Sequence, residues 1–161
     1  MENFCQIGKL EKKDGYDVCR DIKRQGNLRY DLTKLLPDCH TLGHYHLPQL
    51  PELFEVLSGR AVFLIQRNEE TYAIEAEEKE KIIVLPDFSI RTINPSNTRD
   101  LIVSNWIDDK VKNIYNAFKK IPEPIKLKPK PLPKELENLE FLTQPEKYKN
   151  LLTIENLYAR C

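Results

Sequence analysis

Residues able to bind a metal ion occur close together within the first third of the chain. Two of the three histidines, His44 and His46, are separated by a single residue, and Glu52 follows after five intervening residues. On a β-strand, residues i and i+2 project from the same face, so both imidazoles would point the same way. A carboxylate from the next strand would then complete a set of two histidines and one glutamate around one divalent metal.

Strand alternation selects Glu52, rather than its neighbour Glu55, as the carboxylate of this set. In a strand over residues 52–57, Glu52 and Phe54 share one face, whereas Glu55 lies on the other. If Glu52 faces the metal, Phe54 lines the same cavity. The alternative is an exposed strand that carries two solvated histidines and an unrelated glutamate. The third histidine, His40, is a weak ligand candidate because the residues after it do not follow a regular strand pattern.

The composition excludes several classes of function. The 161 residues include 25 lysines and arginines and 25 aspartates and glutamates, so the formal net charge is zero. A neutral chain has no general electrostatic attraction to nucleic acids or to anionic membranes. No apolar run is long enough to span a bilayer and no apolar signal segment follows Met1, so we expect a cytoplasmic protein. The four cysteines lie far apart without metal-site spacing, and we expect them to be reduced.

Most of the chain has the pattern of short strands separated by turn residues. Residues 1–27 are expected to form N-terminal strands or an arm, with a turn at residues 12–15. Alternating apolar residues predict further strands over residues 27–36, 52–57, 60–67, 71–75, 81–85, 89–94 and 101–107. Many short strands without intervening helices are typical of an antiparallel sandwich or a small barrel. We therefore expect a mainly β barrel over residues 28–107.

The pattern changes in residues 108–161, which we expect to extend the barrel. Asp108 and Asp109 can cap a helix, because apolar residues then recur at helical spacing at Val111, Ile114, Tyr115 and Phe118. The sequence therefore predicts a short C-terminal helix directly after the last barrel strand.

A segment rich in proline and lysine follows this predicted helix. Its five prolines, spread over residues 122–133, are typical of an extended polyproline-like strap. The strap is either a spacer lying over the barrel or a Pro-rich recognition ligand. Its lysines, Lys126, Lys128 and Lys130, are either solvated or placed to meet a phosphate. Residues 135–160 are expected to form one or two short helices that dock on the same domain or on a neighbouring subunit.

The amino-acid sequences of three segments resemble those of the cupin-type glucose-6-phosphate isomerases of archaea. These segments are TLGHYH at residues 41–46, PELFEVLSG at 51–59 and RTIN at 91–94. The resemblance covers residues 28–107, about half of the chain. It implies a cupin fold, which is a double-stranded β-helix or jelly-roll barrel, and a homodimer with one divalent metal (iron, manganese, nickel or zinc). The implied activity is the interconversion of glucose 6-phosphate and fructose 6-phosphate, a step of glycolysis and gluconeogenesis.

The resemblance also implies roles for individual residues. Thr41 and Gly43 match positions near the substrate phosphate, whereas His44, His46 and Glu52 match three metal ligands. In this reading the metal polarises the sugar oxygens and Glu52 is also a catalytic proton carrier.

Three departures from the family pattern bear on catalysis. Ile90 stands where the family has a fourth ligand, a histidine. Phe54 replaces an aromatic hydroxyl, and residues 108–115 lack the Gly-His-Asp-Tyr-Gly stretch of the family. The alternative function is therefore a catalytically degenerate cupin that binds a small ligand or serves as an assembly module. A two-His-one-carboxylate Fe(II) oxygenase site is a third, less supported reading. Arg91, next to Ile90, is expected to point out of the barrel toward a salt bridge or a subunit contact.

Overall fold

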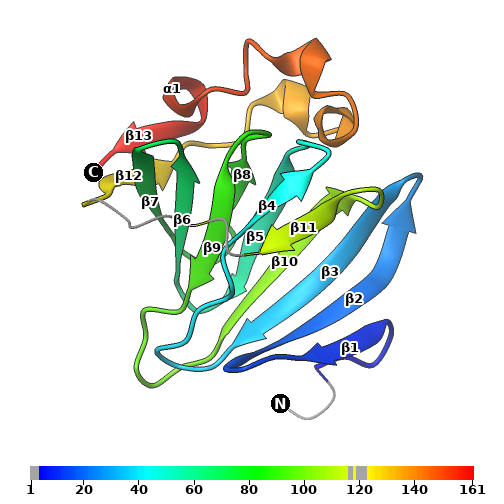
Figure 1. The fold of residues 1–161 in the computed structure, drawn as a ribbon, viewed down its shortest axis with the longest axis vertical. Coiled ribbons are helices and arrows are strands. Elements are labelled where there is room, and N and C mark those ends of the chain that lie inside the picture. The colour runs from blue at the N-terminus through cyan, green and yellow to red at the C-terminus, as the bar shows by residue number, and fades with distance from the viewer. Residues whose placement is uncertain (1–3, 116–117, 119–122) are drawn as a thin grey trace.

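The computed structural model describes residues 4–115, 118 and 123–161. In these residues two β-sheets face each other (Figure 1). The six-stranded sheet has the strand order β1 (Lys9–Lys12), β2 (Tyr16–Gln25), β3 (Leu28–Leu35), β10 (Leu101–Asp108), β5 (Glu52–Ser58) and β8 (Lys81–Val84). The seven-stranded sheet has the order β11 (Lys112–Tyr115), β4 (His44–Leu47), β9 (Ser89–Ile93), β6 (Ala61–Arg67), β7 (Glu70–Ala76), β12 (Ile125–Pro129) and β13 (Tyr158–Arg160).

All seven strands predicted between residues 27 and 107 are present, because alternation along each of them places apolar side chains between the sheets. In β5, Phe54 and Val56 are buried on the face that carries Glu52, whereas Leu57 is exposed. The strand ends at Ser58, and the next residue, Gly59, has a φ of 94°, which lies in the left-handed region. A Cβ atom at Gly59 would lie 2.9 Å from the carbonyl oxygen of Asp100, so both the backbone angle and the space favour glycine.

The core fills the space between the two sheets and gives the site rigid walls. Its largest fully buried side chains include Phe63, Ile65, Ile74, Ile82 and Leu101. Because such interiors are close-packed, truncating a residue such as Phe63 to alanine costs about 3–5 kcal/mol of stability. Strands anchored in this core therefore hold their cavity-facing side chains in fixed positions.

The helix predicted after Asp108 is wrong, because this segment is a turn followed by strand β11. The Oδ1 atom of Asp108 accepts a hydrogen bond from the backbone N–H of Lys110 at 3.0 Å, which stabilises the turn locally. Beyond the turn, β11 pairs antiparallel with β4 as far as Tyr115. The apolar spacing fits a strand as well as a helix, and the pairing with β4 decides between them. Residues 116–117 and 119–120 of the predicted helix lie outside the described residues.

The Pro- and Lys-rich segment is part of a sheet, not a spacer lying over the barrel. Strand β12 pairs parallel with β7 on one side and antiparallel with β13 on the other. Leu127 is buried, whereas Lys126, Lys128 and Lys130 are exposed. With neighbours on both sides, β12 has no free edge at which to pair with a recognition partner. Residue 122, the first of the segment, lies outside the described residues.

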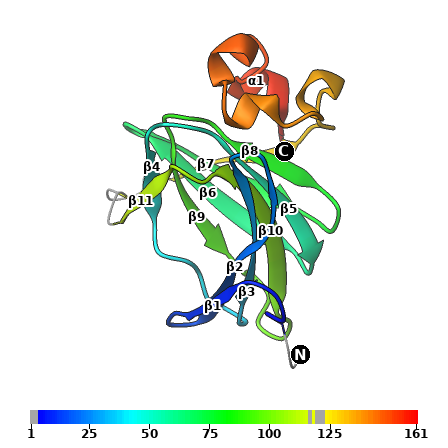
Figure 2. The same ribbon diagram turned by 90° about the vertical axis from the view of Figure 1, so that its right-hand side faces the viewer.

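The C-terminal tail packs over the end of the sandwich that lies opposite the N terminus (Figures 1 and 2). It contains the short turns η1 (Lys134–Leu136), η2 (Glu140–Leu142), η3 (Pro145–Tyr148) and the helix α1 (Ile154–Leu157). Its buried side chains are Leu136, Phe141, Leu142, Leu157 and Tyr158. The hydroxyl group of Tyr158 accepts a hydrogen bond from the N–H of Ile83 at 3.0 Å and donates one to the carbonyl oxygen of the same residue. The tail is thus fastened to its own barrel.

The expectation that all four cysteines are reduced is wrong for one pair. Cys5 and Cys19 form a disulfide bond with a Cα–Cα distance of 5.3 Å. The pairing of β1 with β2 brings the N-terminal segment back beside Cys19, which a sequence separation of 14 residues does not reveal. Cys39 and Cys161 are free thiols. Among the described residues, no helix has the length and hydropathy that a bilayer span requires.

Candidate metal centre and adjoining cavity

Strands β4 and β5 bring the three predicted ligands together from opposite sheets. His44 and His46 project from one face of β4, and their ring centroids lie 5.3 Å apart. Glu52, the first residue of β5, faces them across the interior of the sandwich. The potential ligand atoms of His44, His46 and Glu52 all lie within 4.8 Å of one another. Glu55 is not part of this group, as strand alternation predicts.

Hydrogen bonds from neighbouring groups orient two of these side chains. Nδ1 of His46 lies 3.0 Å from the carbonyl oxygen of Leu50, to which it can only donate, so Nε2 is the nitrogen left to face Glu52 and carries the lone pair when the ring is neutral. Oε2 of Glu52 accepts a hydrogen bond from the side-chain amide of Asn105 on β10 at 2.8 Å, which leaves Oε1 available. Such outer contacts fix the orientation of metal ligands in proteins.

The two atoms that remain available are buried and lack hydrogen-bond partners. Nε2 of His46 and Oε1 of Glu52 lie 3.1 Å apart, which is an ion pair when His46 is protonated, but their angles do not make a hydrogen bond. Because buried polar atoms are almost always paired, a pair of unsatisfied atoms facing each other needs an explanation. A divalent cation bound by both atoms and by His44 would satisfy them. Two histidines and one carboxylate suit Fe(II) or Mn(II), with open positions for further ligands.

The electrostatics of the group favour ligand atoms that carry lone pairs. Burial lowers the pKa of His44 to about 4; the Glu52 carboxylate opposes this shift and the neighbouring His46 adds to it. Burial would raise the pKa of Glu52, but contact with His46 and the nearby His44 outweighs it, so the pKa is lowered. Burial would lower the pKa of His46, but the contact with Glu52 outweighs it and the pKa is raised. The group therefore holds one carboxylate and one neutral imidazole, and binding of a metal ion would require His46 to give up a proton from Nε2.

A cavity of about 60 Å³ adjoins two of the three residues, His44 and Glu52. Its walls include His44, Glu52, Phe54 and Thr41, all of which the sequence analysis singled out. They also include polar residues that it did not assign to the site: Lys13, Tyr16, Arg20, Thr33, Thr92, Asn105, Asn113 and Tyr115. Four of the missed residues share one signal, since Tyr16, Val18 and Arg20 alternate along β2 and Asn113 and Tyr115 alternate along β11.

Thr41 and Gly43, which were predicted to lie near the substrate phosphate, and Phe54 differ in their surroundings. Oγ1 of Thr41 accepts a hydrogen bond from the N–H of Thr92 at 3.0 Å, which fixes its position at the cavity. Gly43 is packed under a side chain, because a Cβ atom there would lie 2.2 Å from Cδ2 of Phe118. Phe54 stacks on Phe63 with a centroid distance of 5.2 Å and offers no hydroxyl group.

Ile90, in the place of the fourth ligand, is 1% exposed and pairs directly with His44. Opposite residues of an antiparallel pair project to the same side, so Ile90 gives this side of the group an apolar wall. His40 is exposed, forms an isolated bridge with Ile93 and does not belong to the ligand group. The guanidinium of Arg91 lies 5.2 Å from the ring centroid of Phe118, so it makes a cation–π contact where a salt bridge was one expectation.

Comparison with solved structures shows which class of protein this architecture defines. Oxalate oxidase in complex with the substrate analogue glycolate matches with a TM-score of 0.58 and 13% identity, over 72% of this chain and 62% of that one. A mutant of oxalate decarboxylase from Bacillus subtilis matches with a TM-score of 0.60 and 14% identity, over 67% of this chain and 30% of that one. Vicilin from hazelnut, Corylus avellana, matches with a TM-score of 0.56 and 17% identity, over 71% of this chain and 37% of that one. These are cupins, and the present chain has the cupin fold.

The chain spans only part of these relatives, and none of the curated proteins matches its sequence. The family described as "Glucose-6-phosphate isomerase (GPI)" matches residues 9–122, which is most of the chain. The protein belongs to the glucose-6-phosphate isomerase family. The match includes strands β1 and β2, which lie outside the segment that carries the local resemblance in sequence.

Proposed function

We propose that this protein is a metal-dependent sugar-phosphate isomerase that interconverts glucose 6-phosphate and fructose 6-phosphate. The observation that carries the proposal is the pair of buried atoms His46 Nε2 and Glu52 Oε1, which have no hydrogen-bond partner and of which Glu52 lines a cavity, in a member of this family. His44, His46 and Glu52 would hold the ion, which would act as a Lewis acid toward the oxygens on C1 and C2 of the open-chain sugar.

The residues of the chain would supply binding and proton transfer. Glu52 is the one carboxylate among the described residues that line the cavity, so its carboxylate group is the proposed carrier of a proton between C1 and C2. Tyr16, Thr41 and Tyr115 line the same cavity, and their hydroxyl groups would hold the sugar chain by hydrogen bonds. Two aromatic hydroxyls are thus present at the cavity although Phe54 provides none.

A coupled assay with fructose 6-phosphate tests the proposal. The protein is loaded with Mn(II) or Fe(II), its metal content is measured, and formation of glucose 6-phosphate is followed. We expect turnover that depends on metal and disappears in Glu52→Ala, with Glu55→Ala as a matched control on the opposite face of the same strand. Stoichiometric metal without turnover would refute the isomerase.

The second candidate is a cupin that binds a small ligand or acts as an assembly module without catalysis. The buried Ile90 beside His44 favours it, because the fourth position around the ion then has no protein ligand. The same assay distinguishes the two functions, since turnover that Glu52→Ala abolishes excludes a purely binding role. A cytoplasmic location and a homodimer remain part of the proposal, and size-exclusion chromatography with light scattering tests the latter.

A further inference from the structure

We propose that Arg20 binds the anionic group of the substrate and thereby makes the cavity selective for phosphorylated or otherwise acidic sugars. The proposal rests on the isomerase function proposed above, since it assigns the residue that would bind the charged end of the same substrate. It is carried by the position of Arg20 on the cavity wall and by the hydrogen-bonding capacity that its neighbours leave free.

The alternation of strand β2 places Arg20 at the cavity. Tyr16, Val18 and Arg20 follow one another on a single face, and all three line the cavity that adjoins His44 and Glu52. The side chain of Arg20 is 23% exposed, so an approaching anion would meet it partly shielded from water. A charge-assisted hydrogen bond is stronger under these conditions than on an open surface.

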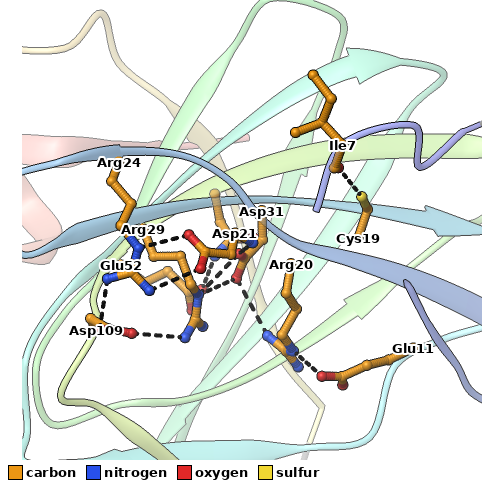
Figure 3. Close-up of polar contacts among 11 residues, drawn as sticks. Ile7, Glu11, Cys19, Arg20, Asp21, Arg24, Arg29, Asp31, Glu52 and Asp109 are labelled. Atoms are coloured by element: carbon orange, nitrogen blue, oxygen red, sulfur yellow. Dashed lines mark hydrogen bonds and ion pairs between the residues drawn. The ribbon is translucent and has the colours of Figure 1, made fainter. Parts of the chain in front are cut away.

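The guanidinium of Arg20 is only partly engaged by the protein. Its Nε atom donates to Oε2 of Glu11 at 2.9 Å, and its Nη1 atom donates to Oδ2 of Asp31 over a long 3.4 Å (Figure 3). A guanidinium has five N–H groups, so three of them have no partner in the part of the chain that the structure describes. A planar fork with free donors matches the oxygen geometry of a phosphate or a carboxylate.

The neighbouring charges also leave Arg20 available. Asp31, which is fully buried, accepts hydrogen bonds from Nε of Arg29 at 3.0 Å and from the N–H of Asp21 at 2.8 Å, so its charge is compensated without Arg20. Glu11 is shared between Arg20 and Lys13, whose Nζ lies 3.8 Å from it. Among the described residues that line the cavity, Lys13 and Arg20 are the cations and Glu52 is the one carboxylate, so the side of the cavity formed by Lys13 and Arg20 attracts an anion.

Hydroxyl groups on the same walls complete a site for an anion. The Tyr16 oxygen accepts from the N–H of Leu42 at 3.4 Å, and Oγ1 of Thr41 accepts from the N–H of Thr92. Since each hydroxyl acts as an acceptor in these contacts, its hydrogen remains free to donate toward the cavity. The lysines of β12, which were candidates for phosphate binding, do not line this cavity.

The test compares Arg20→Gln with Arg24→Gln. Arg24 lies on the same strand and in the same ion-pair network, bonded to Asp21 and Asp109, but it is exposed and does not line the cavity. Dissociation constants for fructose 6-phosphate are measured by calorimetry on the metal-loaded full chain, with unphosphorylated fructose as the neutral probe. Loss of a charged hydrogen-bond partner predicts a Kd about 10- to 100-fold higher for Arg20→Gln. Arg24→Gln is expected to stay within about twofold, as surface pairs do.

A third variant reverses the effect. Glu11→Gln removes the carboxylate that competes for Arg20 while keeping an oxygen acceptor, so the Kd for fructose 6-phosphate is expected to fall by at least about twofold. Fructose binding is expected to be equal in all three variants. If Arg20→Gln does not fold, as judged by its thermal transition, Arg20→Lys keeps the charge without the planar fork and is expected to show an intermediate Kd.

The outcomes separate this inference from the proposed function. Unchanged affinity for fructose 6-phosphate in Arg20→Gln overturns the role of Arg20, even where the wild type turns over. Affinity that depends on Arg20 in a protein without turnover supports the role while the isomerase activity fails. A wild type that binds fructose as tightly as fructose 6-phosphate overturns the selectivity for anions.

Discussion

Asn105→Ala tests whether the hydrogen bond to Glu52 prepares the carboxylate for a metal ion. The amide of Asn105 donates to Oε2 of the buried carboxylate at 2.8 Å, and a hydrogen bond to a charged group contributes about 1.5–3 kcal/mol. Removing an outer contact of this kind costs about 10–100-fold in metal affinity. At a metal concentration 100 times the wild-type Kd, linkage stabilises the wild type by about 2.7 kcal/mol. With a Kd about 10–100-fold weaker, the same concentration stabilises Asn105→Ala by only about 1.4–0.4 kcal/mol.

The assay is thermal or urea unfolding with and without Mn(II), in which the metal-dependent increment is compared between variants. Asn113→Ala is the matched control, because Asn113 lines the same cavity from β11 but makes no hydrogen bond to Glu52. Asn105→Ala is also expected to be less stable without metal, since Oε2 is left buried and unpaired. An equal metal-dependent increment in Asn105→Ala and the wild type would refute the reasoning, whatever the stability of the metal-free protein.

Three further predictions concern the ligand group and the tail. Glu52→Gln keeps the shape of the side chain but loses its charge, so elemental analysis should show it without metal, whereas Glu55→Gln should retain one equivalent; equal contents would contradict the assignment. Ile90→His adds an imidazole opposite His44, so metal should bind more tightly by calorimetry, while burying a polar ring costs about 1–3 kcal/mol of metal-free stability. Tyr158→Phe leaves a buried backbone N–H without its partner and should cost about 1–3 kcal/mol in urea unfolding; an unchanged midpoint would show that the tail does not depend on this bond.

Sequence alone predicted the strands of the barrel because their period of two is a local property. Glu52, Phe54 and Val56 could be assigned to one face without knowledge of any neighbour, and the structure buries all three. The convergence of His44 and His46 followed from the same rule applied to two residues. Local alternation therefore predicted which side chains share a face, and the resemblance to a family indicated which strand carries the third ligand.

The failures lie where pairing between distant segments decides the structure. The residues after Asp108 satisfy both helical and strand spacing, and only the ladder with β4 selects the strand. Because the segment is a strand, Asn113 and Tyr115 project from the same face and both line the cavity. In a helix, residues two apart would not share a face. Asn105 was missed for the same reason, since its role depends on β10 lying beside β5, where it pairs with Phe54.

The distribution of charge in the cavity explains how a centre with only three protein ligands can still select its substrate. Ile90 offers no ligand atom on the side of His44, so fewer protein contacts would hold an ion there and more positions around it would be open to a substrate. Arg20 lies on another wall of the same cavity and can bind a second, anionic group. A molecule that reaches both must carry oxygens for the metal and a negative charge some distance along its chain. An open-chain sugar phosphate has both features, whereas a neutral sugar has only the first, so under the proposal the charge on Arg20 rather than the metal would decide between them.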